Sequence, residues 1–103
     1  MDNTGIKAGV IEEIRKLAKK YDVTKVILFG SRAREDFKRT SDIDIAVTGG
    51  DIARFALDVD EETSTLLMYD IVNLDWYVQD ELLEAIKKEG KILYENNNAK
   101  ERK

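Results

Sequence analysis

The chain has 103 residues, of which 43% are hydrophobic and 37% charged, and its 17 basic and 21 acidic residues give a net charge of -4. This length suits a single domain, and the acidic balance argues against direct nucleic-acid binding, which needs surplus Lys and Arg. No apolar run is long enough to cross a bilayer, and Met1 is followed by polar residues, so we expect a cytoplasmic protein without a membrane partner.

Histidine and cysteine are both absent from the sequence. Disulfide bonds, thiolate–metal sites, Ser–His pairs and His–zinc sites are therefore excluded for this chain. Any catalysis must use carboxylates, Lys, Arg, Tyr, Ser or a bound metal. Carboxylate oxygens are hard ligands that suit Mg²⁺ or Mn²⁺.

Hydrophobic spacing predicts alternating helices and strands along the first half of the chain. Apolar residues at helical spacing between residues 6 and 21 predict an amphipathic helix. The β-branched and aromatic run at 25–29 predicts a buried strand that ends at Gly30. A short helix is expected at 31–38, and alternation at 43–47 predicts a second strand.

The second half continues this alternation. We expect a helix capped by Asp51, a strand at 66–72, a helix at 78–89 capped by Gly90, and a short strand at 91–94. Residues 1–94 would form one α/β (α+β) domain, a small mixed β-sheet flanked by helices. Residues 95–103 contain little to bury and are expected to form a flexible tail.

Gly30-Ser31 follows a hydrophobic strand and opens a predicted helix. Glycine allows a ligand to approach the backbone closely, and amides at the start of a helix attract anions. A serine hydroxyl can donate a further hydrogen bond to a phosphate oxygen. Taken alone, a Gly-Ser pair after a strand is more often a plain turn and helix cap.

Carboxylates occur at three positions that chemistry could use. Asp42 and Asp44 are two residues apart in a predicted strand, so their side chains share one face. Asp70 interrupts a hydrophobic run, where an unpaired carboxylate is costly. If the two strands are neighbours, the three carboxylates could share a metal. The alternatives are an Asx turn at Asp42 and water-facing aspartates at the other two positions.

Together these features make the pattern Gly-Ser, ten residues, then Asp-x-Asp. The segments Phe29–Arg34, Ser41–Val47 and Asp70–Val72, with the final Gly-Lys-Ile-Leu-Tyr94, resemble the minimal nucleotidyltransferase (MNT) branch of the DNA polymerase beta-type nucleotidyltransferase superfamily. The resemblance covers roughly residues 6–94 and implies the nucleotidyltransferase fold.

The resemblance also implies roles for individual residues. Gly30 and Ser31 would hold the triphosphate of ATP, while Asp42 and Asp44 would bind two Mg²⁺ ions, with Mn²⁺ as the alternative. Asp70 would join the second metal and orient or deprotonate the acceptor hydroxyl.

Three charged residues follow Gly30-Ser31 in the predicted turn and helix. Arg32 is the first candidate for a further triphosphate contact and Arg34 the second, and solvated loop charges are the alternative for both. Glu35 stands where the family usually has glycine soon after this motif. A carboxylate there would disfavour a triphosphate unless it turns away or pairs with an arginine.

The resemblance to MNT antitoxins implies a helical HEPN-domain toxin as partner, in a hetero-oligomer, and transfer of AMP to a tyrosine hydroxyl of that toxin. Two alternatives remain open: an inactive subunit that neutralises its partner by binding alone, and a two-component enzyme that modifies a small molecule of the aminoglycoside kind. Trp76 and Tyr77 are expected at the rim of the core, with contact to a partner or a base as the alternative.

Overall fold

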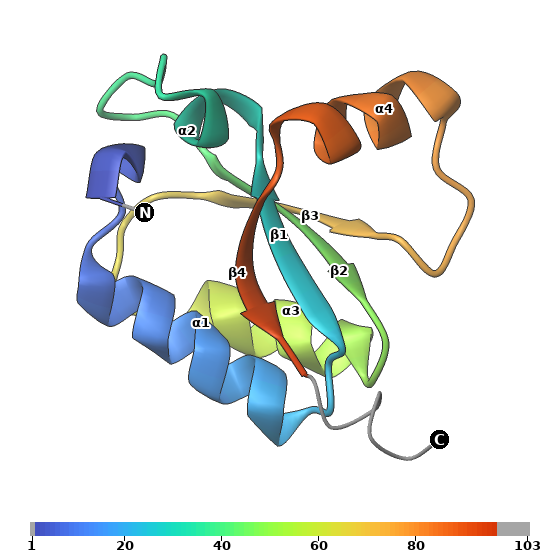
Figure 1. Ribbon diagram of the computed structural model, residues 1–103. Helices are drawn as coiled ribbons and strands as arrows, with labels where there is room; N and C mark the ends of the chain where they lie inside the picture. The colour runs from blue at the N-terminus through green and yellow to red at the C-terminus, as the bar shows by residue number, and fades with distance from the viewer. Residues whose placement is uncertain (1, 97–103) are drawn as a thin grey trace.

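The computed structural model describes residues 2–96 and is built on one four-stranded mixed sheet (Figure 1). The strands are β1 (Lys25–Phe29), β2 (Ile43–Thr48), β3 (Tyr69–Asn73) and β4 (Lys91–Glu95). Their order across the sheet is β3-β2-β1-β4. The β1 strand pairs antiparallel with β2 and β4, whereas β2 and β3 are parallel. This confirms the predicted mixed sheet flanked by helices.

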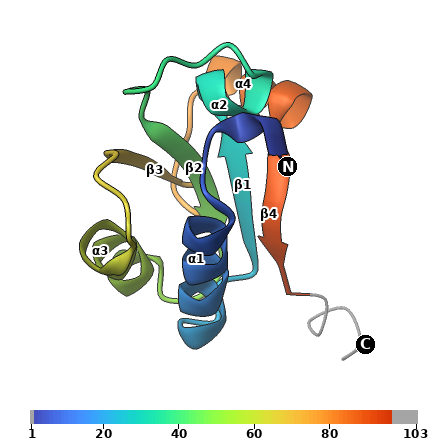
Figure 2. The same cartoon turned by 90° about the vertical axis from the view of Figure 1, so that its left-hand side faces the viewer.

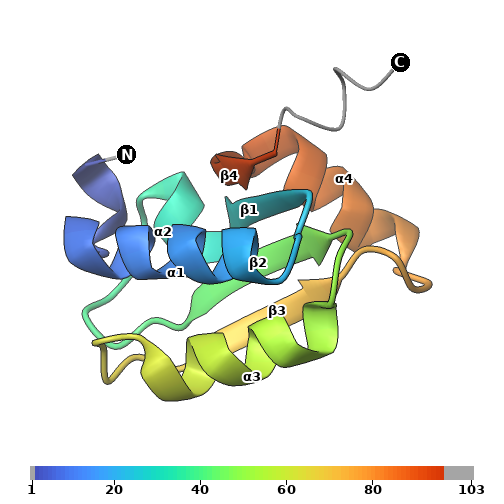
Figure 3. The same cartoon turned by 90° about the horizontal axis from the view of Figure 1, so that it is seen from below.

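Helices cover both faces of the sheet. They are η1 (Asp2–Thr4), α1 (Ala8–Lys20), α2 (Gly30–Arg34), α3 (Ile52–Glu62) and α4 (Asp80–Glu89). The α1 and α3 helices lie side by side on one face, as the views in Figures 2 and 3 agree, and they enclose the larger hydrophobic core. The α2 and α4 helices lie together at the other side of the molecule (Figure 1), where a smaller cluster forms around Phe29, Ala46 and Ile86.

Alternation along β2 separates the two faces. Ile43, Ile45 and Val47 are buried in the larger core, while Ala46 belongs to the smaller cluster. Because side chains alternate along a strand, Asp44 lies on the same face as Ala46, toward α2 and α4. The strand therefore buries one apolar face and directs its one carboxylate, Asp44, toward the opposite face.

Several predicted boundaries were wrong. The helix expected at 31–38 ends at Arg34, because Glu35 adopts a left-handed conformation with φ of 69°. The strand expected at 66–72 begins only at Tyr69, and the preceding Leu66 and Met68 are exposed. Gly90, in contrast, is the C-cap of α4 as predicted: it has an extended conformation, and its amide donates to the Ile86 carbonyl at 2.9 Å.

The C-terminal strand continues beyond the predicted domain boundary at residue 94. Glu95 pairs with Lys25 in the sheet, and the Asn96 amide donates to the Thr24 carbonyl at 2.8 Å. The remainder of the predicted tail, residues 97–103, lies outside the described residues. Among residues 2–96, none of the helices combines the length and the apolar character needed to cross a membrane.

Candidate active site

The turn at Gly30 joins the end of β1 to α2 in a geometry that requires glycine. Its φ of 75° lies in the left-handed region, and a Cβ added there would be 2.2 Å from Oδ2 of Asp44. A side chain at this position would therefore suffer backbone strain and also displace the Asp44 carboxylate. The glycine brings the backbone into close approach with that carboxylate, while the approach of a ligand to this turn remains a prediction.

Asp44 and Asp70 are direct neighbours across the parallel β2–β3 pair. Asp42 precedes Asp44 by two residues, just before β2 begins, and both Asp42 and Asp70 are exposed while Asp44 is half-buried. Burial raises the pKa of Asp44 above its usual value, and the charges of Asp70 and Asp42 raise it further. The structure thus brings the three predicted carboxylates to one region, where like charges repel in the absence of a cation.

A divalent cation fits this donor set. Neighbouring carboxylates on β2 and β3 supply hard oxygens, and the mutual repulsion that raises the pKa of Asp44 is the kind that a cation relieves. Within residues 2–96, no three carboxylates are close enough to enclose a metal by themselves. Mg²⁺ usually takes one or two carboxylates and completes its octahedron with substrate phosphates and water. The metal roles of Asp42, Asp44 and Asp70 remain predictions.

Ser31 occupies the first turn of α2, directly after the glycine. Its carbonyl accepts the amide of Asp36 at 3.1 Å, which closes the short helix, and its side chain is half-exposed. No hydrogen bond of its hydroxyl is recorded among the residues that the structure describes. The hydroxyl is therefore available to a ligand at the turn, and the predicted phosphate contact of Ser31 remains a prediction.

Arg32 has a different environment from the one the sequence suggested. The residue is 1% exposed, and its guanidinium donates to the carbonyls of Thr4 at 2.9 Å, Ser41 at 3.0 Å and Arg39 at 3.3 Å. It also lies over the ring of Phe37, 4.8 Å from the centroid. The side chain holds the N-terminal segment and the loop before β2 against α2, so a phosphate contact would require these bonds to break.

Arg34 is the arginine of this turn that a ligand can reach. Its side chain is 48% exposed, and Nη1 pairs with the Glu89 carboxylate at 3.2 Å. Nε lies 3.2 Å from Oδ2 of Asp36. These contacts hold the guanidinium beside the Gly30 turn, and Asp44 experiences its charge. The second arginine candidate therefore replaces the first as the expected triphosphate contact.

Glu89 is a residue that the sequence reasoning missed. Its Oε2 accepts the Gly30 amide at 2.7 Å, and its carboxylate also binds Arg34. Its position in the sequence could have indicated it. The helix dipole disfavours a carboxylate in the last turn of a helix and favours lysines such as Lys87 and Lys88, which precede Glu89. Such a residue needs a compensating partner.

Glu35, the departure from the family pattern, turns away from the carboxylates. Its Oε2 accepts from Nζ of Lys91 at 2.8 Å, and this contact lowers the pKa of Glu35 below its usual value. The residue keeps the left-handed conformation that a glycine would adopt more easily. Glu35 therefore pairs with a lysine rather than with the arginine that the sequence analysis considered.

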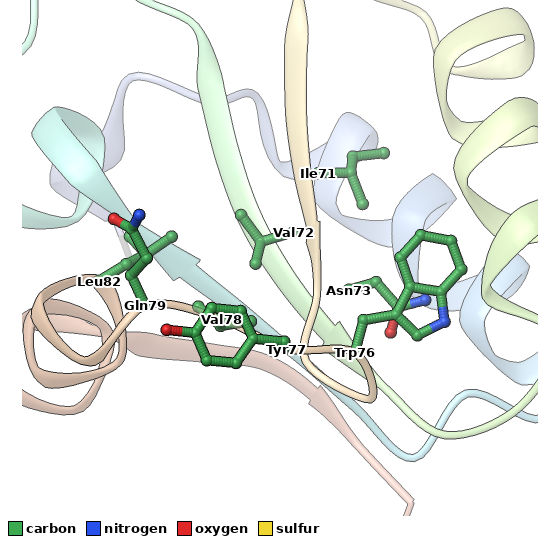
Figure 4. Close-up of a pocket in the computed structure, with 8 residues that line it drawn as sticks. All are labelled: Ile71, Val72, Asn73, Trp76, Tyr77, Val78, Gln79 and Leu82. Carbon is green, nitrogen blue, oxygen red and sulfur yellow. The ribbon is translucent and has the colours of Figure 1, made fainter.

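A pocket of about 340 Å³ lies beside β3 and the start of α4 (Figure 4). Tyr77 and Leu82 lie on the side of β3 that carries Val72, while the Trp76 ring lies on the side of Ile71. Val72 is two residues along the strand from the third carboxylate and so shares its face. Trp76 and Tyr77 are 77% and 88% exposed, so the expected packing at the rim of the core was wrong.

Comparison with known proteins places this site in a family. The family model described as "Polymerase beta, Nucleotidyltransferase" matches residues 12–99. The chain belongs to the polymerase beta nucleotidyltransferase family. It is similar to a Methanocaldococcus jannaschii protein named "Putative protein adenylyltransferase", with 34% identity over an alignment of 101 positions that covers 84% of this chain and 95% of the relative. The predicted nucleotidyltransferase is confirmed.

Solved structures of the same fold come from toxin–antitoxin complexes. A chain of a toxin–antitoxin crystallised with AMP-PNP has a TM-score of 0.68 and 29% identity, covering 88% of this chain and 77% of that one. A chain of the tri-AMPylated Shewanella oneidensis HEPN toxin in complex with MNT antitoxin has a TM-score of 0.61 and 25% identity, covering 89% and 75%. These likenesses confirm the predicted resemblance to the MNT proteins.

Proposed function

We propose that this nucleotidyltransferase transfers AMP from ATP to a tyrosine hydroxyl of a helical HEPN-type partner protein, with Mg²⁺ as the metal. The observation that carries the proposal is the alignment of Asp44 with Asp70 directly beside the Gly30 turn. This arrangement puts a candidate metal-binding pair next to a candidate phosphate-binding turn. Nucleotidyl transfer needs the metal-binding pair and the phosphate-binding turn to be no farther apart than the length of a triphosphate.

The reaction joins the acceptor oxygen to the α-phosphorus of ATP. The bond between that phosphorus and the oxygen bridging to the β-phosphorus breaks, and pyrophosphate leaves. The Gly30-Ser31 turn and Arg34 bind the phosphates, and Asp70 orients the acceptor hydroxyl and accepts its proton directly or through water. A divalent cation bound to Asp42 and Asp44 would neutralise the charge that develops on the phosphates.

The acceptor assignment rests on the relatives. The M. jannaschii protein carries the name of a protein adenylyltransferase, and one structural neighbour is a complex with a tri-AMPylated HEPN toxin. The pocket with Tyr77 and Leu82 beside β3 gives an acceptor segment an apolar surface that includes Val72, on the face of the strand that also carries Asp70. In this proposal the chain acts in the cytoplasm as the antitoxin of a hetero-oligomer, with ATP as donor.

Intact-mass spectrometry tests the proposal directly. A HEPN-type candidate partner is incubated with the chain, ATP and Mg²⁺, and its mass is compared with that after incubation with the Asp44→Asn variant. We expect gains of whole AMP units with the native chain alone, at a tyrosine located by peptide mapping. A stable complex without a mass gain would contradict transfer and favour neutralisation by binding.

A further inference from the structure

The end of α4 is tied to the phosphate turn through one carboxylate. Glu89 accepts the Gly30 amide at 2.7 Å and lies 3.2 Å from Nη1 of Arg34. These two groups belong to opposite ends of the five-residue helix α2. A single side chain therefore fixes both the peptide that opens the helix and the guanidinium at its end.

Close packing sets this carboxylate in place. A Cβ on Gly90 would be 2.6 Å from Cγ2 of Ile27 and 2.4 Å from the Ile86 carbonyl, so the glycine lets the end of α4 approach β1. Two residues after Glu89, Lys91 reaches Glu35 at the other end of α2. Contacts on both sides of Gly90 thus fasten α2 to the α4–β4 junction.

The Glu89 and Arg34 side chains differ in how accessible they are to a ligand. The Glu89 side chain is 17% exposed and the Arg34 side chain 48% exposed, so the carboxylate is the more enclosed partner and the guanidinium the more accessible one. Nη2 of Arg34 makes no hydrogen bond recorded among residues 2–96. The arginine can therefore keep Glu89 on one edge while Nη2 donates to a phosphate oxygen.

We propose that Glu89 is a positioning residue for nucleotide binding: by accepting the Gly30 amide it fixes the conformation of the turn, and by pairing with Arg34 it holds the guanidinium beside the triphosphate. The inference rests on the proposed function, since it takes the Gly30 turn as the triphosphate site. An ion pair that holds a guanidinium in place reduces the conformational freedom lost when a ligand binds. Its removal weakens nucleotide affinity while the fold remains.

The test measures binding of AMP-PNP with Mg²⁺ to the full chain by isothermal titration calorimetry. For Glu89→Ala we expect the dissociation constant to rise about tenfold, the scale of lost supporting contacts. For Glu89→Gln we expect a smaller rise, because the amide oxygen can still accept the Gly30 amide but carries no charge for Arg34. The matched control is Glu84→Ala, an exposed carboxylate of the same helix, which should bind like the native chain.

Coupling to the arginine separates positioning from a general structural role. In an Arg34→Ala background, Glu89→Ala should raise the dissociation constant by clearly less than in the native chain, because part of its effect passes through that guanidinium. Melting temperatures of Glu89→Gln and the native chain should agree within about 2 °C, a shift worth well under 1 kcal/mol.

Three results would overturn the inference: tighter binding in the Glu89 variants, which would make the carboxylate a competitor of phosphate; unchanged binding; or an equal loss with and without Arg34. Failure of the native chain itself to bind AMP-PNP with Mg²⁺ would instead overturn the proposed function. The two failures are therefore distinguishable in one experiment.

Discussion

Replacing Gly30 with alanine should damage both stability and nucleotide binding. At φ of 75° an alanine costs about 1–2 kcal/mol relative to glycine. The added Cβ would also lie 2.2 Å from Oδ2 of Asp44, which forces that side chain from its rotamer at about 0.5–1.5 kcal/mol. Alanine also reduces the conformational entropy of the unfolded chain, which offsets the loss of stability by about 0.5–1 kcal/mol. The expected net loss is about 2 kcal/mol.

Urea denaturation of Gly30→Ala beside Gly9→Ala measures this loss against a matched control. Gly9 lies exposed in α1, and an added Cβ would meet nothing within 4 Å. Alanine there should stabilise the protein by about 0.5–1 kcal/mol. The two variants should therefore differ by about 2–3 kcal/mol, and Gly30→Ala alone should lose affinity for AMP-PNP with Mg²⁺. Equal stability and equal affinity of the two variants would refute the close approach of Gly30 to Asp44.

Three further perturbations test separate parts of the structure. The Glu35→Gly variant should be more stable than Glu35→Ala by about 1 kcal/mol in chemical denaturation, because both substitutions remove the Lys91 contact and only glycine suits a φ of 69°. A more stable Glu35→Ala variant, which is the normal order for a helix interior, would contradict this. Arg32→Ala should lower the free energy of unfolding by at least about 3 kcal/mol, because it leaves buried carbonyls unpaired. Arg34→Ala should lower it by less than about 1 kcal/mol and yet weaken AMP-PNP binding. Equal stability losses in the two variants would contradict the different roles of the two arginines. Hydrogen bonds from the Thr48 hydroxyl and the Gly49 amide lower the pKa of Asp75 below 3.8, so its contribution is present above that pH and is lost as the pH falls through the lowered pKa. The stability difference between the native chain and Asp75→Asn should shrink from about pH 5 to about pH 2, and a constant difference would count against it.

The fold was largely predictable because its elements are encoded by local patterns. The alternation of Ile43, Ile45 and Val47 placed both aspartates of the motif on one face without any knowledge of the tertiary structure. Errors arose where conformation depends on distant contacts. Glu35 ends α2 early in a left-handed conformation, and its partner Lys91 comes from the last strand. No local preference of glutamate indicates this.

The site residues also differ in how far the sequence predicts them. Gly30, Asp42 and Asp44 could be proposed because their spacing follows the ends of the adjacent strands β1 and β2. Asp70 could be proposed because a carboxylate interrupts the hydrophobic run of β3, and the roles of all four residues remain predictions. The roles of the arginines could not be predicted, since the choice between burial and exposure depends on how the N-terminal segment and the loop before β2 fold over α2. Arg32 is enclosed by carbonyls from Thr4 and Ser41, which a linear pattern does not reveal.

The most direct test of the central claim follows the two ends of the triphosphate. The chain and its HEPN-type partner are incubated with Mg²⁺ and either α-labelled or γ-labelled ATP, and label on the partner is counted after denaturation. We expect label from the α-phosphate and none from the γ-phosphate, and loss of labelling with both the Asp44→Asn and the Asp70→Asn variants. Transfer of the γ-phosphate, or undiminished labelling in either variant, would contradict this claim.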